Sequence, residues 1–233
     1  MGSQTSALYM RKKKTKKPLN LLQHNNGYRY SIDALLLADF IQCTANDTWI
    51  DLGTGCGIIP IAVAMKQNFK ICWAIDIQSD LCMIAHQNLL QYHLLDKIKI
   101  LEADIRELIY YFPAYRTDFV VSNSPYGNLN SGRLNLNWEK SIARHELFLN
   151  LDDIMKTAEY LMKHDGHIYM IYPYQYYALL KKTLANNAFY PEHIRCVTHK
   201  NACKPQFVLF KASKKKISVV QEENVSITHN MFI

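Results

Sequence analysis

Short apolar runs of strand length alternate with longer segments of helical spacing along most of the chain. Short apolar runs bounded by polar or glycine residues indicate buried strands, and apolar residues spaced about three to four apart indicate amphipathic helices. The pattern predicts strands at 47–52, 69–76, 97–104, 117–124, 167–172, 193–200 and 205–212. It predicts helices at 32–43, 58–67, 80–93, 105–112, 151–164 and 174–187, with Ser31 and Ser79 as caps of the first and third.

The order of these elements predicts the fold class. Strands that alternate with helices form a parallel sheet with helices on both faces. The last two strands have no helix between them, and a short link can only join antiparallel neighbours. We therefore expect an α/β sheet of seven strands that ends in an antiparallel pair. A basic arm at 1–19, expected to be flexible, precedes this single domain at 20–212, and a polar tail at 213–233 follows it.

The composition is that of a globular protein. Of the 233 residues, 49% are hydrophobic and 20% are charged. No apolar run approaches the roughly 18 to 20 residues of a membrane span, and the start shows no secretory signal, so we expect a cytoplasmic protein without a membrane anchor. Six cysteines without a C-x-x-C pair and nine scattered histidines predict buried, reduced thiols and no metal site.

Positive charge is concentrated near the two ends of the chain. The net charge is +7, and a run near the start contains Arg11, Lys12, Lys13, Lys14, Lys16 and Lys17. A second basic run covers 214–216. Such runs are commonly solvated and bind nothing. The alternative is that they bind the phosphates of a nucleic acid, with an affinity that falls as salt is added. Composition leaves both interpretations open.

A glycine-rich loop lies between the first predicted strand and the helix that follows it. Residues 51–57 read Asp-Leu-Gly-Thr-Gly-Cys-Gly. Glycine lets the chain turn tightly at the strand end and lets a ligand approach main-chain amides. The alternative is a structural turn without a ligand. We expect a bound cofactor to contact residues of this loop, namely Asp51, Gly53, Thr54, Gly55 and Gly57.

Two carboxylates follow the next two strands. Asp76 stands where a doubly wound fold binds the hydroxyls of a ribose. Asp104 stands at the end of the third strand and can accept a hydrogen bond from the amino group of an adenine. Ile77 and Ile105, which come next in the chain, are expected at the same pocket. The alternative for each aspartate is a helix N-cap.

These features resemble the class I S-adenosylmethionine-dependent methyltransferases. The first motif of that family is similar to residues 51–57, and its ribose-binding residue stands in the position of Asp76. The final strand pair is similar to the antiparallel seventh strand of the same family. The resemblance implies a Rossmann-like fold with S-adenosylmethionine as the cofactor.

The segment Asn123-Ser124-Pro125-Tyr126 resembles the N-P-P-Y or N-x-P-Y tetrapeptide of enzymes that methylate amide or exocyclic amino nitrogens. An adenine amino group is a poor nucleophile and needs orientation rather than a strong base. The Asn123 side-chain oxygen and the Ser124 carbonyl can each accept one N–H and turn the nitrogen lone pair towards the methyl group. Pro125 stiffens that carbonyl, and Tyr126 can stack on the base. The resemblance implies that these four residues are catalytic and that Asn123 also borders the cofactor. Ser124 replaces the commoner proline, and an ordinary Asn-Pro turn is the alternative.

Two flanking segments narrow the resemblance. Residues 27–38 (GYRYSIDALLLA) and 143–146 (ARHE) are similar to those of the bacterial tRNA (adenine-N6)-methyltransferases that modify position 37 of a valine tRNA. The likeness runs from about residue 20 to 211. It implies that Asp33 lies at the cofactor pocket, although a carboxylate placed only to suit a helix N-terminus is an equal explanation. It also implies a tRNA substrate and no obligate protein partner. Arg144 is expected to contact the RNA together with the basic arm, or else to pair with Glu146.

Three other functions remain open. A glutamine-N5 methyltransferase of a peptide-release factor uses a similar tetrapeptide, but it carries a separate helical domain for which the 50 residues before Asp51 leave little room. A DNA adenine methyltransferase is less favoured, because it is expected to have an additional target-recognition domain and none is predicted here. A non-catalytic RNA-binding protein on the same fold is the third, and the intact glycine loop with Asp76, Asp104 and Asn123 favours a working enzyme. The tRNA species, the nucleotide and the oligomeric state stay open.

Overall fold

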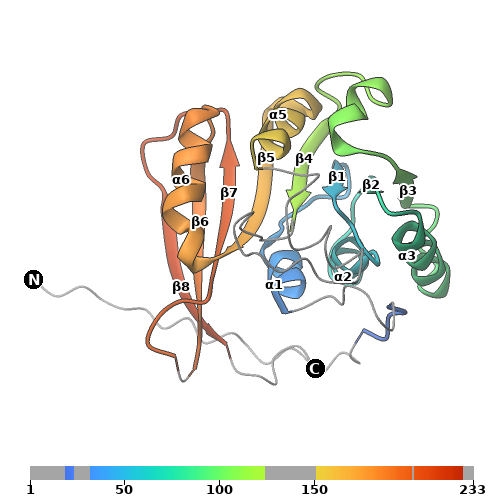
Figure 1. Ribbon diagram of the computed structural model, residues 1–233, viewed down its shortest axis with the longest axis horizontal. Coiled ribbons are helices and arrows are strands. Elements are labelled where there is room, and N and C mark those ends of the chain that lie inside the picture. The colour runs from blue at the N-terminus through green and yellow to red at the C-terminus, as the bar shows by residue number, and fades with distance from the viewer. Residues whose placement is uncertain (1–18, 24–31, 124–150, 201, 228–233) are drawn as a thin grey trace, which may run out of the picture.

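A computed structural model describes residues 19–23, 32–123, 151–200 and 202–227, which form an α/β fold around one sheet (Figure 1). The strands are β1 Thr48–Leu52, β2 Ile71–Asp76, β3 Ile98–Glu102, β4 Thr117–Ser122, β5 Met162–Pro173, β6 Tyr190–His199, β7 Phe207–Ser213 and β8 Gln221–Ile227. The α-helices are α1 Ile32–Phe40, α2 Ile58–Ala64, α3 Ser79–Gln91, α5 Leu151–Leu161 and α6 Tyr177–Asn186. Two 3-10 helices are η1 Ile105–Tyr110 and η2 Tyr174–Tyr176.

The strand order in the sheet is β3-β2-β1-β4-β5-β7-β6-β8. Strands β1 to β5 pair in parallel, and β7 runs antiparallel to both β5 and β6. The predicted α/β class and the antiparallel strand near the end of the chain are confirmed. Parallel neighbours need crossover connections, which helices supply among β1 to β5, and the chain reverses direction at the short links before and after β7.

The structure differs from the expected sheet by one additional strand. β8 pairs in parallel with β6 and lies within the segment expected to be a polar tail. Its sequence is polar because it is an edge strand whose residues are mostly exposed or half-buried, and only Ile227 is fully buried. Glu223 on this strand accepts a hydrogen bond of 2.5 Å from the Arg195 guanidinium of β6. The folded domain therefore extends past residue 212, to Ile227.

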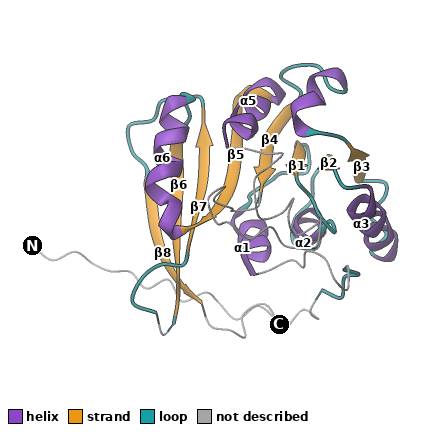
Figure 2. Ribbon diagram, in the orientation of Figure 1, coloured by secondary structure: helices purple, strands orange, loops and turns teal. Residues whose placement is uncertain are grey.

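Helices cover both faces of the sheet (Figure 2). On one face, α1, α2 and α3 pack against a core that includes Trp49, whose ring stacks on Phe119 at a centroid distance of 5.1 Å. On the other face, η1, α5 and α6 pack against a core that includes Ile50. Neighbouring residues of β1 thus point to opposite faces of the sheet. Burial of each large apolar side chain contributes about 1.5–3 kcal/mol to the free energy of unfolding.

Several predicted boundaries shift by a few residues. Ser79 is the first residue of α3 and Gln78 occupies the N-cap, so the expected serine cap is wrong by one position. The helix expected at 151–164 ends at Leu161, where β5 begins. The pairing of β4 with β5 jumps from Met162 to His167, and a Cβ atom on Gly166 would lie 2.9 Å from the Lys163 carbonyl oxygen. Glycine is therefore required for this irregular start of the strand.

Candidate functional site

The carboxyl ends of the parallel strands bring the predicted site residues to one edge of the sheet (Figure 1). Leu52 of β1 pairs with Ile75 of β2 on one side and with Ser122 of β4 on the other. The residues that follow these strands therefore leave the sheet side by side, and Gly53 lies next to Asn123. Ligands bind at this edge in open α/β sheets.

The glycine loop has a backbone that other residues rarely adopt. Gly53, Gly55 and Gly57 have φ angles of +76°, +58° and +81°. The amides of Gly53 and Thr54 both donate to the Ile75 carbonyl, at 2.9 and 2.8 Å, and hold the loop against the end of β2. A Cβ atom on Gly53 or Gly55 would meet no atom of the described residues within 4 Å. The loop thus presents bare main chain to open space, where a ligand can approach it.

Asp76 supports this loop from β2. Its Oδ2 accepts a hydrogen bond of 2.8 Å from the Gly55 amide, and its Oδ1 accepts one of 3.0 Å from the Gln78 amide. Burial raises the pKa of the Asp76 carboxyl, while the hydrogen bonds from backbone amides lower it. The loop contact was not expected from the sequence. Each carboxylate oxygen can accept more than one hydrogen bond, so the predicted contact with ribose hydroxyls remains compatible with it.

Asp51 is a fully buried carboxylate without a hydrogen-bond partner among the described residues. Neither of its oxygens nor the Thr54 hydroxyl has a partner with good hydrogen-bond geometry, although the Thr54 hydroxyl lies close enough to the carboxylate to act on its pKa. Burial raises the pKa of Asp51 from its ordinary 3.8 to about 7, an effect that the nearby Thr54 hydroxyl reduces and the charge of Asp76 increases. Buried polar groups are nearly always satisfied in proteins, so these three atoms fit a site that is completed by a polar ligand.

The raised pKa of Asp51 predicts how stability depends on pH. The unfolded chain releases this proton near pH 3.8 and the folded chain near pH 7, so the folded state loses stability as the pH rises between these values. Asp51→Asn removes this loss. The advantage in unfolding free energy of the variant over the native protein, both without ligand, should be about 2–3 kcal/mol larger at pH 8 than at pH 5.

Urea unfolding at the two pH values measures this difference. Asp96→Asn removes a charge from an exposed turn and is the control, which should leave the pH dependence of the native protein unchanged. An equal advantage of Asp51→Asn at both pH values would show that Asp51 is not a proton-binding buried carboxyl.

Asp104 is an N-cap in the structure. Its Oδ1 accepts a hydrogen bond of 2.9 Å from the Arg106 amide, and its carboxylate also pairs with the Arg106 guanidinium. These contacts, led by the side-chain bond with Arg106, lower the pKa of Asp104. The capping alternative is confirmed. The role as an acceptor for an adenine amino group stays a prediction, and it requires the exposed Arg106 side chain to share or release the carboxylate.

The other predicted cofactor residues occupy different surroundings. Ile77 follows Asp76 and is 42% exposed, whereas Ile105 is buried in the core beneath α5. Asp33 lies in the first turn of α1, is 4% exposed, and accepts a hydrogen bond of 2.8 Å from the Ala34 amide. This contact suits the helix-terminus explanation, and the pocket explanation stays a prediction.

Of the tetrapeptide at 123–126, the structure describes Asn123, which follows β4 and is half-buried. Ser124, Pro125 and Tyr126 lie outside the described residues, as does Arg144. The basic residues of the arm, Arg11, Lys12, Lys13, Lys14, Lys16 and Lys17, also lie outside them. Their assigned roles remain predictions.

Sequence reasoning missed Asn88 of α3. Its fully buried side chain donates to the carbonyl oxygens of Leu22 and Cys56, at 3.0 and 2.9 Å, and accepts a bond of 2.7 Å from the Leu22 amide. It therefore joins the glycine loop to the segment at 19–23. The available signal was a single polar residue on the apolar face of a helix, next to Leu89 and one turn from Ala85.

The second basic run proves to be structural at its first residue. Lys214 contacts Glu159 at 2.7 Å, donates to the Asn187 carbonyl and lies 4.6 Å from the centroid of the Phe189 ring. It follows Ser213, which pairs with His167 near the start of β5, at the opposite edge of the sheet from Asn123. These contacts give Lys214 a structural role, and binding of a nucleic acid by residues 214–216 stays a prediction.

The cysteines are all free, as expected for thiols, but not all are buried. Cys56, Cys72 and Cys82 are buried, and Cys203 is exposed. Burial raises the pKa of Cys56 to about 11 and that of Cys82 to about 12, so both remain protonated thiols at neutral pH.

The described residues hold no group of three potential metal ligands. None of their helices is long and apolar enough to cross a membrane.

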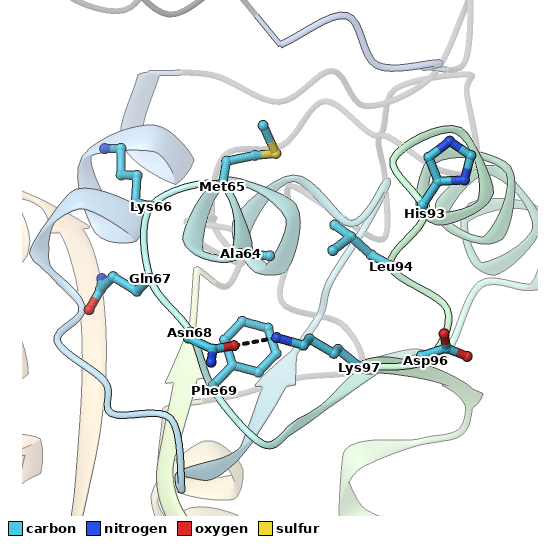
Figure 3. Close-up of a pocket in the computed structure, with 10 residues that line it drawn as sticks. All are labelled: Ala64, Met65, Lys66, Gln67, Asn68, Phe69, His93, Leu94, Asp96 and Lys97. Carbon is cyan, nitrogen blue, oxygen red and sulfur yellow. Dashed lines mark hydrogen bonds between the residues drawn. The ribbon is translucent and has the colours of Figure 1, made fainter.

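A cavity of about 420 Å³ lies at the opposite edge of the sheet from the glycine loop (Figure 3). It is formed where α2 and α3 end, by residues such as Met65 and Leu94, and the Lys97 ammonium crosses it to bond Asn68. Because the strand ends with Gly53, Asp76 and Asn123 are at the other edge, this cavity is separate from the candidate site.

Comparison with known proteins decides the family. Residues 44–225 match the sequence profile described as a methyltransferase domain. The chain belongs to the methyltransferase domain family. The match contains the glycine loop, Asp76, Asp104 and Asn123, whereas Asp33 and the basic arm precede it.

Two curated relatives of this methyltransferase share one name. A tRNA1(Val) (adenine(37)-N6)-methyltransferase from Aliivibrio salmonicida is 27% identical over 148 residues, which are 64% of this chain and 61% of that protein. A protein of the same name from a Flavobacteriaceae bacterium is 24% identical over 208 residues, 88% and 86% of the two chains. The resemblance drawn from the flanking segments is thereby confirmed. The chain spans about three fifths of the length of the first of these relatives.

Solved structures confirm the Rossmann-like fold of this methyltransferase. A predicted O-methyltransferase from Agrobacterium tumefaciens superposes with a TM-score of 0.62 at 19% identity, covering 84% of this chain and 85% of that one. TrmK from M. capricolum, in complex with S-adenosyl-homocysteine, gives 0.57 at 15% identity, with coverage of 82% and 72%. TrmN from Thermus thermophilus gives 0.55 at 21% identity, with coverage of 78% and 48%.

Proposed function

We propose that this protein is an S-adenosylmethionine-dependent methyltransferase that methylates N6 of an adenine in tRNA, adenosine 37 of the anticodon loop. The observation that carries the proposal is the register of β1 and β4. Leu52 pairs with Ser122, so the residue that would orient the amino group, Asn123, follows β4 beside the first glycine of the loop that would hold the cofactor.

The residues at the glycine loop fit the cofactor. S-Adenosylmethionine supplies a methyl group on a positively charged sulfonium, and it carries ribose hydroxyls and an ammonium group. The buried Asp76 carboxylate can accept hydrogen bonds from hydroxyls, and the unpartnered oxygens of Asp51 and Thr54 can accept them from polar hydrogens. The open space over Gly53 and Gly55 admits a ligand to the main chain.

Asn123 is assigned to the acceptor nitrogen. Its side-chain oxygen accepts one N–H of the amino group, and the carbonyl of Ser124 accepts the other. Both bonds reduce conjugation of the nitrogen with the adenine ring and turn its lone pair towards the methyl group. Tyr126 stacks on the adenine. Orientation of the two reactants can contribute a large part of the acceleration, because a bimolecular step becomes effectively unimolecular.

The choice of tRNA rests on the names of the curated relatives and on the flanking segments at 27–38 and 143–146. An anticodon-loop base is easier to extrude into a site than a base inside a duplex. The basic arm and Arg144 are assigned to phosphate contacts. A methyltransferase for glutamine N5 of a release factor remains the second candidate, because its tetrapeptide would use Asn123 in the same way.

The test is to incubate the native protein with labelled cofactor and either total tRNA or a release factor. Label should enter tRNA and not the release factor. Label confined to a glutamine-containing peptide of the release factor would establish the second candidate instead. Binding of tRNA without methylation of either substrate would support the non-catalytic alternative.

A further inference from the structure

The turn after β5 and the turn between β6 and β7 lie at the same end of the sheet as the carboxyl end of β4 (Figure 1). Pro173 at the end of β5 pairs with Phe207, and Phe207 pairs with Val197 of β6. The Tyr174 amide donates a hydrogen bond of 2.8 Å to the Gln206 carbonyl, which joins the β5–α6 turn to the β6–β7 turn. The two turns therefore form one continuous surface.

Aromatic rings are stacked on this surface. Tyr174 stacks on Tyr177 with ring centroids 5.5 Å apart and planes inclined by 10°, and Tyr177 stacks on Phe210 at 5.7 Å. Tyr174 has no second ring partner among the described residues, so it ends the stack. The Lys181 ammonium lies 5.5 Å from the centroid of the Tyr177 ring. A planar group that stacks on Tyr174 would extend the existing column of rings.

The turns also carry positive charge. Lys200 and Lys204 are exposed in the β6–β7 turn, and Lys181 is exposed on α6. In the described part of the chain, none of these three ammonium groups forms an ion pair within 4 Å. Burial is the main cause that raises the pKa of Tyr177, and the negative charge of the Glu222 carboxylate on β8 raises it further. Tyr174 and Tyr177 are half-buried against the core, and lysines beside accessible ring surface are the combination that binds single-stranded nucleic acid.

The surface lies at a suitable distance from the proposed acceptor site. Ser122 pairs with Met170, so Asn123 is level with Ile171, and Tyr174 follows three residues later. Three residues of extended chain and one strand spacing separate the two positions by about 11 Å. A nucleotide next to a base held at Asn123 can reach this distance.

We propose that this surface, formed by Tyr174, Tyr177, Lys181, Lys200 and Lys204, binds the single-stranded RNA that flanks the target adenine. A flanking base stacks on Tyr174, at the end of the ring column, and Lys200 and Lys204 contact phosphates. The inference rests on the proposed function, because it takes RNA to be the substrate. It assigns substrate recognition to the part of the fold that follows β5.

The first test separates stacking from packing at Tyr174. Tyr174→Leu keeps an apolar side chain against Tyr177 but removes the flat ring, and Tyr174→Phe keeps the ring. The dissociation constant of an anticodon stem-loop RNA of valine tRNA should rise about 5- to 150-fold in Tyr174→Leu, and by less than about 2-fold in Tyr174→Phe. The cofactor dissociation constant should be unchanged in both variants, which also reports that they are folded.

The second test uses the salt dependence of binding to the same RNA. The double variant K200Q/K204Q should reduce the slope of log K against log salt by about 1.4, since each single-strand phosphate contact contributes about 0.7. The control K70Q/K97Q removes two lysine charges at the opposite edge of the sheet, before β2 and β3, and should leave the slope unchanged.

Methylation by the native protein separates this proposal from the proposed function. If native protein methylates tRNA and K200Q/K204Q and Tyr174→Leu bind RNA as the native protein does, the surface assignment is overturned and the function stands. If native protein neither binds nor methylates RNA, both are overturned. Loss of affinity for a release factor instead of RNA in these variants would also overturn the surface assignment.

Discussion

Replacement of Asn123 with alanine should nearly abolish methylation of tRNA and leave cofactor binding almost unchanged. The side chain is assigned to one N–H of the acceptor, and Asn123 follows β4 beside the glycine loop rather than within it. Loss of one group that is positioned for the reacting centre typically lowers kcat by about 10²- to 10³-fold. Single-turnover methylation and calorimetric titration with S-adenosyl-homocysteine measure the two effects on the same variant.

Asn68→Ala is the matched control for this experiment. Asn68 is an exposed amide before β2, at the edge of the sheet that carries no predicted site residue, and its loss should affect neither measurement by more than about 2-fold. If Asn123→Ala instead weakened cofactor binding as severely as it lowered kcat, Asn123 would belong to the cofactor site and the assigned role would be wrong.

Replacement of Asp76 with alanine should have the opposite order of effects. Its carboxylate is 6% exposed, accepts the Gly55 amide and is assigned to the ribose hydroxyls. Each hydrogen bond to a charged group contributes about 1.5–3 kcal/mol, so loss of two ligand bonds should weaken cofactor binding by roughly 10²-fold or more. At saturating cofactor, kcat should fall by much less, because the lost bonds stabilise ground state and transition state alike.

Asp96→Ala is the control for Asp76→Ala, since it removes an exposed aspartate from the turn before β3. It should bind the cofactor as the native protein does. An unchanged cofactor dissociation constant in Asp76→Ala would refute the ribose assignment and reduce Asp76 to a support for the glycine loop. Thermal unfolding of both variants without ligand reports the cost of losing that support separately.

The order of the strands and helices could be predicted because apolar periodicity reports burial directly. β1, β2 and β4 are buried on both faces by helices, so each reads as a short apolar run ending at Asp51, Asp76 or Asn123. The glycine loop could be predicted for a similar reason. Its three left-handed φ angles favour glycine, and the residue type therefore records the backbone.

The features that were missed depend on contacts between segments far apart in the chain. β8 is an edge strand whose charged residues pair with β6, and an exposed edge leaves no apolar pattern to read. Lys214 looks like part of a solvated run but is held by Glu159 and Phe189. Asn88 satisfies a backbone segment 66 residues away. Side-chain partners of this kind are set by the fold and not by local sequence.

Asn123 and the glycine loop are assigned to bring a methyl group to an exocyclic amino nitrogen. The most direct test is to locate the methyl group by mass spectrometry of nucleosides from tRNA incubated with the native protein and cofactor. We expect N6-methyladenosine with the native protein and none with Asn123→Ala. A methyl group on a ring nitrogen or carbon of the base, which needs no orientation of an amino group, would contradict this assignment.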